Sequence, residues 1–160
     1  MYDREKAIEY ARKWAYARNP QYYSFDDIGG DCTNFVSQCL YAGCGVMNYT
    51  PDLGWYYNSL NDRSAAWTGV EYFYNFLVSN RENGPYGEEQ PLTNAETGDI
   101  VQLSFDGIKF THNLIITRII LFPSPDNILI ACHSFDSLDR RLSTYDYKLA
   151  RLIHILGSRG

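Results

Sequence analysis

The spacing of apolar residues changes near residue 99, and this change constrains the fold more than any other feature of the sequence. Before it, apolar side chains recur every three or four residues, as in an α-helix with one buried face. After it, short runs rich in Val, Ile and Leu are separated by turn-forming residues, which is typical of β-strands. Helices followed by strands favour an α+β fold in which an antiparallel sheet packs against the early helices.

Three helices are predicted in the first half of the chain. Asp3 is placed to cap the first of them, and Asn19-Pro20 ends it. Gly43 and Gly45 end the second. The predicted helices are Arg4–Arg18, Thr33–Ala42 and Ser64–Asn80. The stretch from 46 to 63 is predicted as a loop and that from 81 to 98 as polar and turn-forming, because Gly, Pro and Asn are frequent there.

Four strands are predicted in the second half, and two turn signals separate the first three. Asp106-Gly107 and the stretch from Pro123 to Asp126 supply these turns, so the strands should form an antiparallel meander. The predicted strands are Asp99–Phe105, His112–Leu121, Asn127–Ser134 and Arg151–Leu156. A chain of 160 residues with 45% hydrophobic content fits one globular domain, residues 1–160.

Charge and hydropathy exclude several classes of partner. The net charge is −5 and the two signs are interspersed, so no basic face suggests nucleic acid. No apolar run approaches the roughly 20 residues of a membrane span, and the opening MYDREKAIEY lacks the pattern of a signal peptide. The four cysteines have neither metal-ligand spacing nor the density of a disulfide scaffold. We therefore expect no metal, no cofactor and no membrane span.

The segment GGDCTNFVSQCL places Cys32 at or just before the first turn of the second predicted helix. The unpaired N–H groups and partial positive charge of a helix N-terminus favour a thiolate, the reactive form of cysteine. The same N–H groups are suited to stabilise an oxyanion. Cys32 is therefore a candidate nucleophile, although a cysteine before a helix is more often a small buried side chain.

Three histidines are available as a base for this cysteine. His112 opens one predicted strand and His133 closes the next, so a tight hairpin should bring them together. One would then serve as the base and the other would orient it. His154 lies within the apolar run LIHIL and is interpreted as a structural residue.

Several segments together resemble a known family. GGDCTNFVSQCLYAG, the preceding YARKWAYARNPQYYSF and the later GDIVQL, THNLIIT and CHSF are similar to the putative amidase domain of bacterial, especially clostridial and bacillar, proteins. They resemble more distantly the NlpC-type and CHAP-type cysteine amidases and peptidases of the papain-like superfamily. The resemblance covers nearly the whole chain and implies a papain-like fold and a cysteine-dependent amide hydrolase.

The resemblance also implies roles for individual residues. The nucleophile falls on Cys32, the base on His112 and the residue that orients the base on His133, with Asp136 and Ser134 as alternatives for this third position. The residues expected near the oxyanion are Tyr22, with Asn19 and Tyr23 as alternatives, and Asp31 as an auxiliary residue.

The loop that holds Trp55 and Tyr56 is predicted to line the substrate groove, with covering of the core as an equally supported alternative. The expected substrate is a peptide or peptidoglycan amide, and the expected setting is a bacterial cell surface as part of a longer protein. A catalytically silent module that binds peptide or carbohydrate is the alternative function. A redox or metal protein has little support, since the sequence lacks Cys-x-x-Cys. The sequence is compatible with cleavage of either the N-acyl-muramyl-Ala amide or a bond within the stem peptide.

Overall fold

The computed structural model describes residues 1–160 as four α-helices and eight strands. The helices are α1 (Arg4–Trp14), α2 (Cys32–Cys44), α3 (Ala65–Thr68) and α4 (Val70–Ser79), and two short 3-10 helices are η1 (Leu92–Asn94) and η2 (Leu142–Thr144). The strands are β1 (Tyr57–Ser59), β2 (Asp62–Arg63), β3 (Gly84–Gln90), β4 (Ile100–Ser104), β5 (His112–Ile119), β6 (Ile128–Cys132), β7 (Ser137–Arg141) and β8 (Leu149–Arg159).

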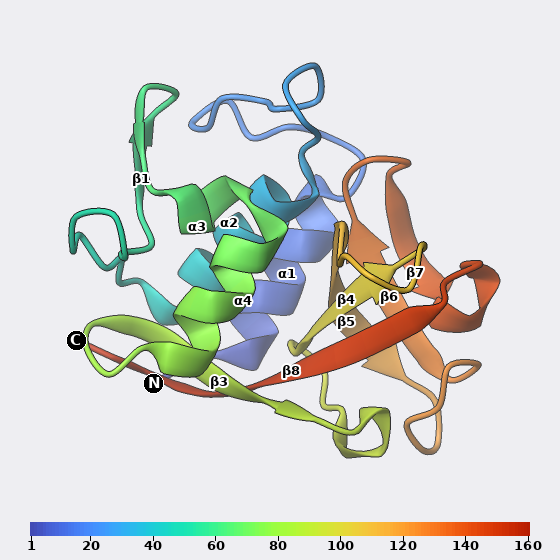
Figure 1. Ribbon diagram of the computed structural model, residues 1–160. Coiled ribbons are helices and arrows are strands. Elements are labelled where there is room, and N and C mark those ends of the chain that lie inside the picture. Colours follow the sequence, from blue (N-terminus) through green and yellow to red (C-terminus); the bar gives the residue numbers. More distant parts are fainter.

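Six of the strands form one antiparallel sheet in the order β3-β8-β4-β5-β6-β7, while β1 and β2 form a separate hairpin. The helices come first along the chain and pack on this sheet, so the predicted α+β architecture is confirmed. β4, β5 and β6 are the predicted meander, but the last strand returns to pair between β3 and β4. In Figure 1 this strand, β8, is the long ribbon that crosses the molecule below the helices.

The sheet carries a hydrophobic core on each face. Alternate residues of a strand point to opposite faces, so neighbours such as Leu114 and Ile115 belong to different cores. The larger core lies between the sheet and the helices and includes Ile115 and the buried aromatic residues Phe35, Trp55 and Trp67. The smaller core lies on the other face and includes Leu114, Leu103 and Leu142.

Two predicted helices differ from the observed ones. α1 ends at Trp14, four residues before the predicted end at Arg18. The third predicted helix is interrupted at Gly69, whose backbone is extended with φ −111° and ψ 128°. Gly69 both ends α3 and precedes α4, so the chain changes direction there.

The sequence did not predict β3, β7 or the β1-β2 hairpin. β3 and β7 are the two edge strands of the sheet. An edge strand pairs on one side only, and part of its surface faces solvent, so it needs less of the apolar pattern by which the inner strands were predicted. The segment of β3, GPYGEEQ, is accordingly polar and was predicted as turn-forming.

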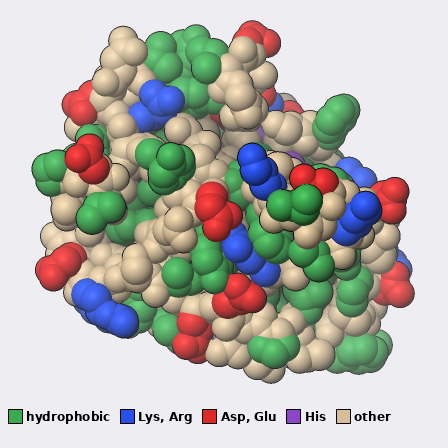
Figure 2. Space-filling model, viewed as in Figure 1, with side chains coloured by type: hydrophobic (Ala, Val, Ile, Leu, Met, Phe, Trp, Pro, Cys, Tyr) green, Lys and Arg blue, Asp and Glu red, His purple; other side chains and the backbone are tan.

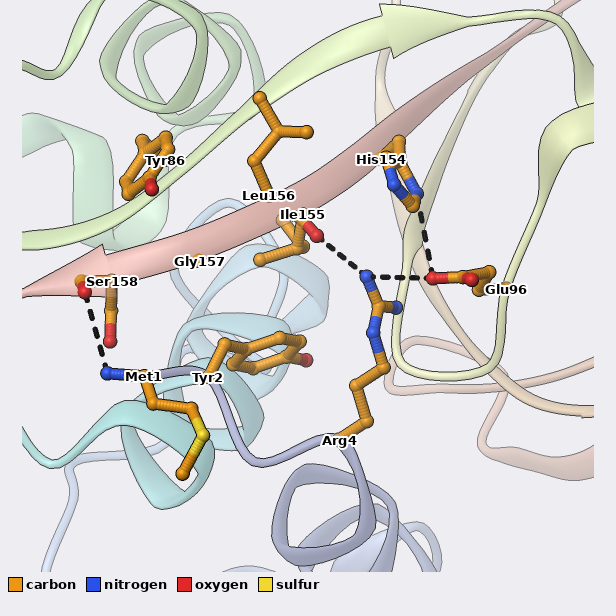
Figure 3. Close-up of a pocket in the computed structure, with 10 residues that line it drawn as sticks. All are labelled: Met1, Tyr2, Arg4, Tyr86, Glu96, His154, Ile155, Leu156, Gly157 and Ser158. Atoms are coloured by element: carbon orange, nitrogen blue, oxygen red, sulfur yellow. Dashed lines mark hydrogen bonds and ion pairs between the residues drawn. The ribbon is translucent and has the colours of Figure 1, made fainter.

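A charged cluster joins the two ends of the chain around a cavity of about 410 Å³ (Figure 3). Asp99 is fully buried and accepts hydrogen bonds from Arg4 Nη1 at 2.8 Å and from the backbone N–H of Ile155 at 3.0 Å. His154 Nδ1 lies 2.9 Å from the same carboxylate, which gives this histidine a structural role. The N-terminal amine donates to the carbonyl of Ser158 at 3.4 Å, so the first and last segments lie side by side.

No helix of the structure combines the length and apolar character needed to cross a membrane. Figure 2 shows acidic and basic side chains interspersed on the face it presents.

Candidate active site

Cys32 is the first residue of α2 and is 9% exposed. Gly29 and Gly30 precede it with φ values of 80° and 94°, a left-handed backbone that glycine adopts without strain and that turns the loop into the helix. The backbone of Asn113 hydrogen-bonds the thiol, and Thr33 Oγ1 lies 3.8 Å from the sulfur. The sulfur therefore lies against the start of β5, next to the position of His112.

Burial raises the pKa of the Cys32 thiol above its ordinary value, and the hydrogen bonds from Asn113 and Thr33 oppose this only in part. The sequence predicted a lowered pKa from the position at the helix N-terminus. The structure differs because burial removes water that would stabilise the thiolate. The helix N-terminus and the hydrogen bonds to the sulfur do not fully compensate for this loss.

His112 is the first residue of β5 and, with Leu114, points to the face of the smaller core. Burial lowers the pKa of its imidazole to about 4, and the nearby charge of Arg140 acts in the same direction. Its ring makes no hydrogen bond to the protein, and its centroid lies 5.8 Å from that of Tyr145. At neutral pH the imidazole is therefore uncharged.

His112 lines a cleft of about 460 Å³. This volume falls in the usual range of small-molecule sites. The other lining residues come from the β4-β5 turn and from the segments around β7, and they are Phe105, Thr111, Ser134, Phe135, Arg140 and Tyr145.

His133 does not orient His112 in this structure. Its Nδ1 lies 2.5 Å from Asp31 Oδ2 and its Nε2 lies 2.8 Å from the Trp14 carbonyl, so both ring nitrogens are engaged elsewhere. The register of the hairpin explains this. Ile115 pairs with Ala131, so His133 lies opposite Asn113 and shares its face, while His112 points to the other face. The predicted hairpin is present, but its register differs by one residue from the one that would place His133 opposite His112, so the two side chains point to opposite faces of the sheet.

Asp31 is the centre of a buried polar network. One carboxylate oxygen accepts hydrogen bonds from the backbone N–H of Phe25 at 2.8 Å and from Asn34 Nδ2 at 2.9 Å. The other faces His133 and lies 3.7 Å from Arg18 Nε. The His133 ring also stacks on Phe35, with centroids 4.0 Å apart. This network fixes the backbone that enters α2 immediately before Cys32.

The two alternatives for the orienting position also have other partners. Ser134 lines the cleft with a φ of 63°, and its Oγ accepts a hydrogen bond from the backbone N–H of Asp31 at 3.4 Å. Asp136 accepts two hydrogen bonds from Arg18, each 3.0 Å long. No side chain hydrogen-bonds the ring of His112, so the structure presents a cysteine and a histidine without the predicted third member.

Tyr22 lies in an aromatic cluster and not in the cleft. Its ring stacks on Trp67 at a centroid distance of 6.0 Å, and it lies 5.1 Å from the ring of Tyr57. Burial raises the pKa of its hydroxyl to about 12. Asn19 donates to Tyr10, and the backbone N–H of Tyr23 donates to Tyr57. No hydrogen bond joins any of these three candidate oxyanion residues to Cys32.

The structure corrects the prediction that Trp55 contacts substrate. Trp55 is fully buried, donates from Nε1 to Ser37 Oγ at 3.0 Å and packs 4.7 Å from the ring of Trp67. Tyr56 is half-buried, packs against Tyr49 and does not line the cleft beside His112. This loop therefore covers the core. The Trp55 ring can be buried there because the hydroxyl of Ser37 accepts a hydrogen bond from its one N–H group.

Sequence reasoning missed several residues that shape the site. Asn113 follows His112 directly, touches the thiol with its backbone and donates from Nδ2 to Thr33 Oγ1 at 2.9 Å. A polar residue inside the apolar strand THNLIIT was the available signal. Arg140 and Tyr145 gave none, because their segment was not predicted to form structure. No group of three or more His, Cys, Asp or Glu side chains is arranged to hold a metal ion.

Comparison with known proteins gives one family and one relative. Residues 1–156 match the family described as "Putative amidase domain". The uncharacterized protein YhbB of Bacillus subtilis is 31% identical over 150 residues, which cover 91% of this chain and 46% of that protein. The chain therefore spans about half the length of this relative. No solved structure matches the chain.

Proposed function

Because the chain belongs to the putative amidase domain family, we propose that it hydrolyses amide bonds with Cys32 as the nucleophile and His112 as the base. One observation carries this assignment. The sulfur of Cys32, at the start of α2, contacts the backbone of Asn113, so it lies beside the residue that opens β5 and lines the cleft. The resemblance to the papain-like superfamily implies a cysteine at the start of a helix and a histidine at the start of a strand, and Cys32 and His112 occupy such positions.

The proposed reaction has two halves. His112 takes the thiol proton while the sulfur of Cys32 attacks the amide carbon, and the N–H groups in the first turn of α2 are available to stabilise the oxyanion. Collapse of this intermediate breaks the carbon–nitrogen bond, and His112 returns the proton to the leaving amine. A thioester remains on Cys32. Water then attacks it, with His112 as base, and releases the carboxylic acid and the thiol.

Before substrate binds, the site favours the uncharged forms of Cys32 and His112. Burial raises the pKa of Cys32 and lowers that of His112, so a thiol and a neutral imidazole are the favoured forms at neutral pH. Proton transfer should then accompany the attack instead of preceding it. Asp31 and His133 act as positioning residues, because their hydrogen bonds hold the chain immediately before Cys32.

The proposed substrate class is an amide of peptidoglycan or of a related peptide. Purified peptidoglycan and short peptides should be incubated with the protein, and the products should be analysed by mass spectrometry, since each cleaved bond leaves a different pair of new termini. Cys32→Ala should abolish cleavage, and Cys39→Ala, which changes a buried cysteine of the same helix, should retain it. Full activity of a folded Cys32→Ala variant would exclude the proposal. Binding without cleavage by the wild type would favour the silent module.

A further inference from the structure

We propose that Arg140 makes the cleft beside His112 a carboxylate-binding site, so that preferred substrates carry a free carboxylate close to the amide that is cleaved. This inference deepens the proposed function and rests on it for the identification of the cleft as the substrate site. The binding step itself depends only on the cleft, so it can be tested without catalysis.

The structure holds the guanidinium of Arg140 in a fixed position. Arg140 Nε donates to Thr144 Oγ1 at 2.7 Å, and Nη2 donates to the Thr144 carbonyl at 3.3 Å. The guanidinium carbon lies 3.7 Å from the centroid of the Tyr145 ring, which is a stacked cation–π contact. Nη1 has no hydrogen-bond partner in the protein. A fixed guanidinium with unused donors is suited to bind a carboxylate.

No acidic side chain neutralises this charge. Arg140 forms no ion pair, whereas Arg4, Arg12, Arg18 and Arg151 each pair with a carboxylate. Arg140 is also the one Lys, Arg, Asp or Glu residue among those that line the cleft. His112 adds no charge at neutral pH, because its pKa is lowered to about 4. The cleft therefore presents one uncompensated positive charge beside the proposed base.

The remaining wall of the cleft is largely aromatic. Tyr145, Phe105 and Phe135 line it, and the last two rings are 42% and 92% exposed. Rings exposed beside an unpaired cation favour a ligand with an apolar part and an anionic group. A peptide-like molecule with a free carboxylate has this chemistry, and its neutral amide counterpart lacks the charge.

N-acetylglycine and N-acetylglycinamide provide a matched pair of probes, because they differ only in the carboxylate. Each should be titrated into the isotope-labelled Cys32→Ala protein while the NMR signals of His112 and Tyr145 are followed. The acid should bind about tenfold more tightly than the amide, as expected for one charge-assisted contact. This preference should disappear in Arg140→Gln, be partly retained in Arg140→Lys, and persist in Arg141→Gln, which removes the same charge from an exposed neighbour that does not line the cleft.

Equal binding of acid and amide, no binding of either at His112, or a preference unchanged by Arg140→Gln would overturn the inference. Melting temperatures and the His112 signals of the free variants show whether each variant keeps its fold. The measurement uses a protein without the Cys32 thiol, so it does not depend on catalysis. Failure of the proposed function, seen as absence of cleavage by the wild type, is thus distinguished from failure of carboxylate binding.

Discussion

Asp31 occupies the N-cap position of α2, yet its side chain does not cap the helix. Its two oxygens accept hydrogen bonds from the loop before α2 and from Asn34, and face the imidazole of His133. A carboxylate that is 1% exposed and serves so many donors is costly to remove, because each donor is left buried without a partner. The Asp31 side chain therefore stabilises the loop that leads to Cys32 and does not accept a hydrogen bond from the first turn of the helix backbone.

Asp31→Ala should therefore lower the free energy of unfolding by about 3–5 kcal/mol. Urea unfolding followed by circular dichroism measures this loss. Asp27→Ala is the matched control, since Asp27 is an exposed aspartate of the same loop, and it should change stability by less than about 0.5 kcal/mol. Similar losses for the two variants would contradict the role given to Asp31.

The two cysteines of α2 should separate reactivity from packing. Cys32 is 9% exposed and contacts the backbone of Asn113, whereas Cys39 is fully buried in the larger core. Iodoacetamide should label Cys32 in the folded protein and spare Cys39. Because burial raises the pKa of Cys32 above 9.0, its labelling rate should still rise with pH beyond pH 9. Mass spectrometry of digests at several pH values gives both rates, and fast labelling at mildly acidic pH would show a lowered pKa instead.

Gly69 separates helix α3 from helix α4. A Cβ on this residue would lie 2.9 Å from Tyr72 Cδ2 and 3.0 Å from the carbonyl oxygen of Ala65, both closer than ordinary contact. Gly69→Ala should destabilise the fold by about 1–3 kcal/mol, because the backbone oxygen cannot move away without disturbing α3. Thermal unfolding provides the test. Gly69→Ala combined with Tyr72→Ala relieves one of the two contacts and should recover part of the loss, whereas a stabilised Gly69→Ala would indicate that the break is not required.

The strands show how far the sequence predicts the structure. The inner strands β4, β5 and β6 were predicted within a few residues, because buried strands carry a strong apolar pattern. The edge strands β3 and β7 were missed because an edge strand needs fewer apolar residues, so only hydrogen bonds to a neighbouring strand reveal it. Cys32 and His112 were placed correctly in the secondary structure, since turn and strand boundaries locate them. The sequence did not predict that His133 faces Asp31 and not His112, because this depends on the register of the β5-β6 hairpin, which no local sequence pattern determines.

The six-stranded sheet separates two hydrophobic cores, and the aromatic side chains of the larger core pack loops against the helices. Trp55 lies at the centre of this packing, 4.7 Å from Trp67 and 5.9 Å from Phe76. Trp55→Ala should cost about 3–5 kcal/mol of stability. The labelling rate of Cys32 in the fraction that stays folded should be unchanged. Normal stability with weakened substrate binding would instead restore the substrate role predicted from sequence.

The stability of the whole molecule should depend on pH through His112. Its pKa is about 4 in the folded protein and 6.5 as the ordinary value, so above pH 6.5 both states are neutral and the group contributes no pH dependence. Below pH 6.5 the unfolded chain takes up a proton that the folded protein does not bind, and the free energy of unfolding falls until about pH 4, by a total of about 3 kcal/mol.

Carboxylates also titrate in the lower part of this range, so the wild type must be compared with His112→Gln, which lacks this group alone. Urea unfolding of both proteins at pH 7.5, 6, 5 and 4.5 should show the wild type losing stability faster than the variant as the pH falls. Parallel curves would mean that the imidazole of His112 takes up a proton as easily in the folded protein as in water, and that it is not held in the desolvated position from which we propose it accepts the proton of Cys32.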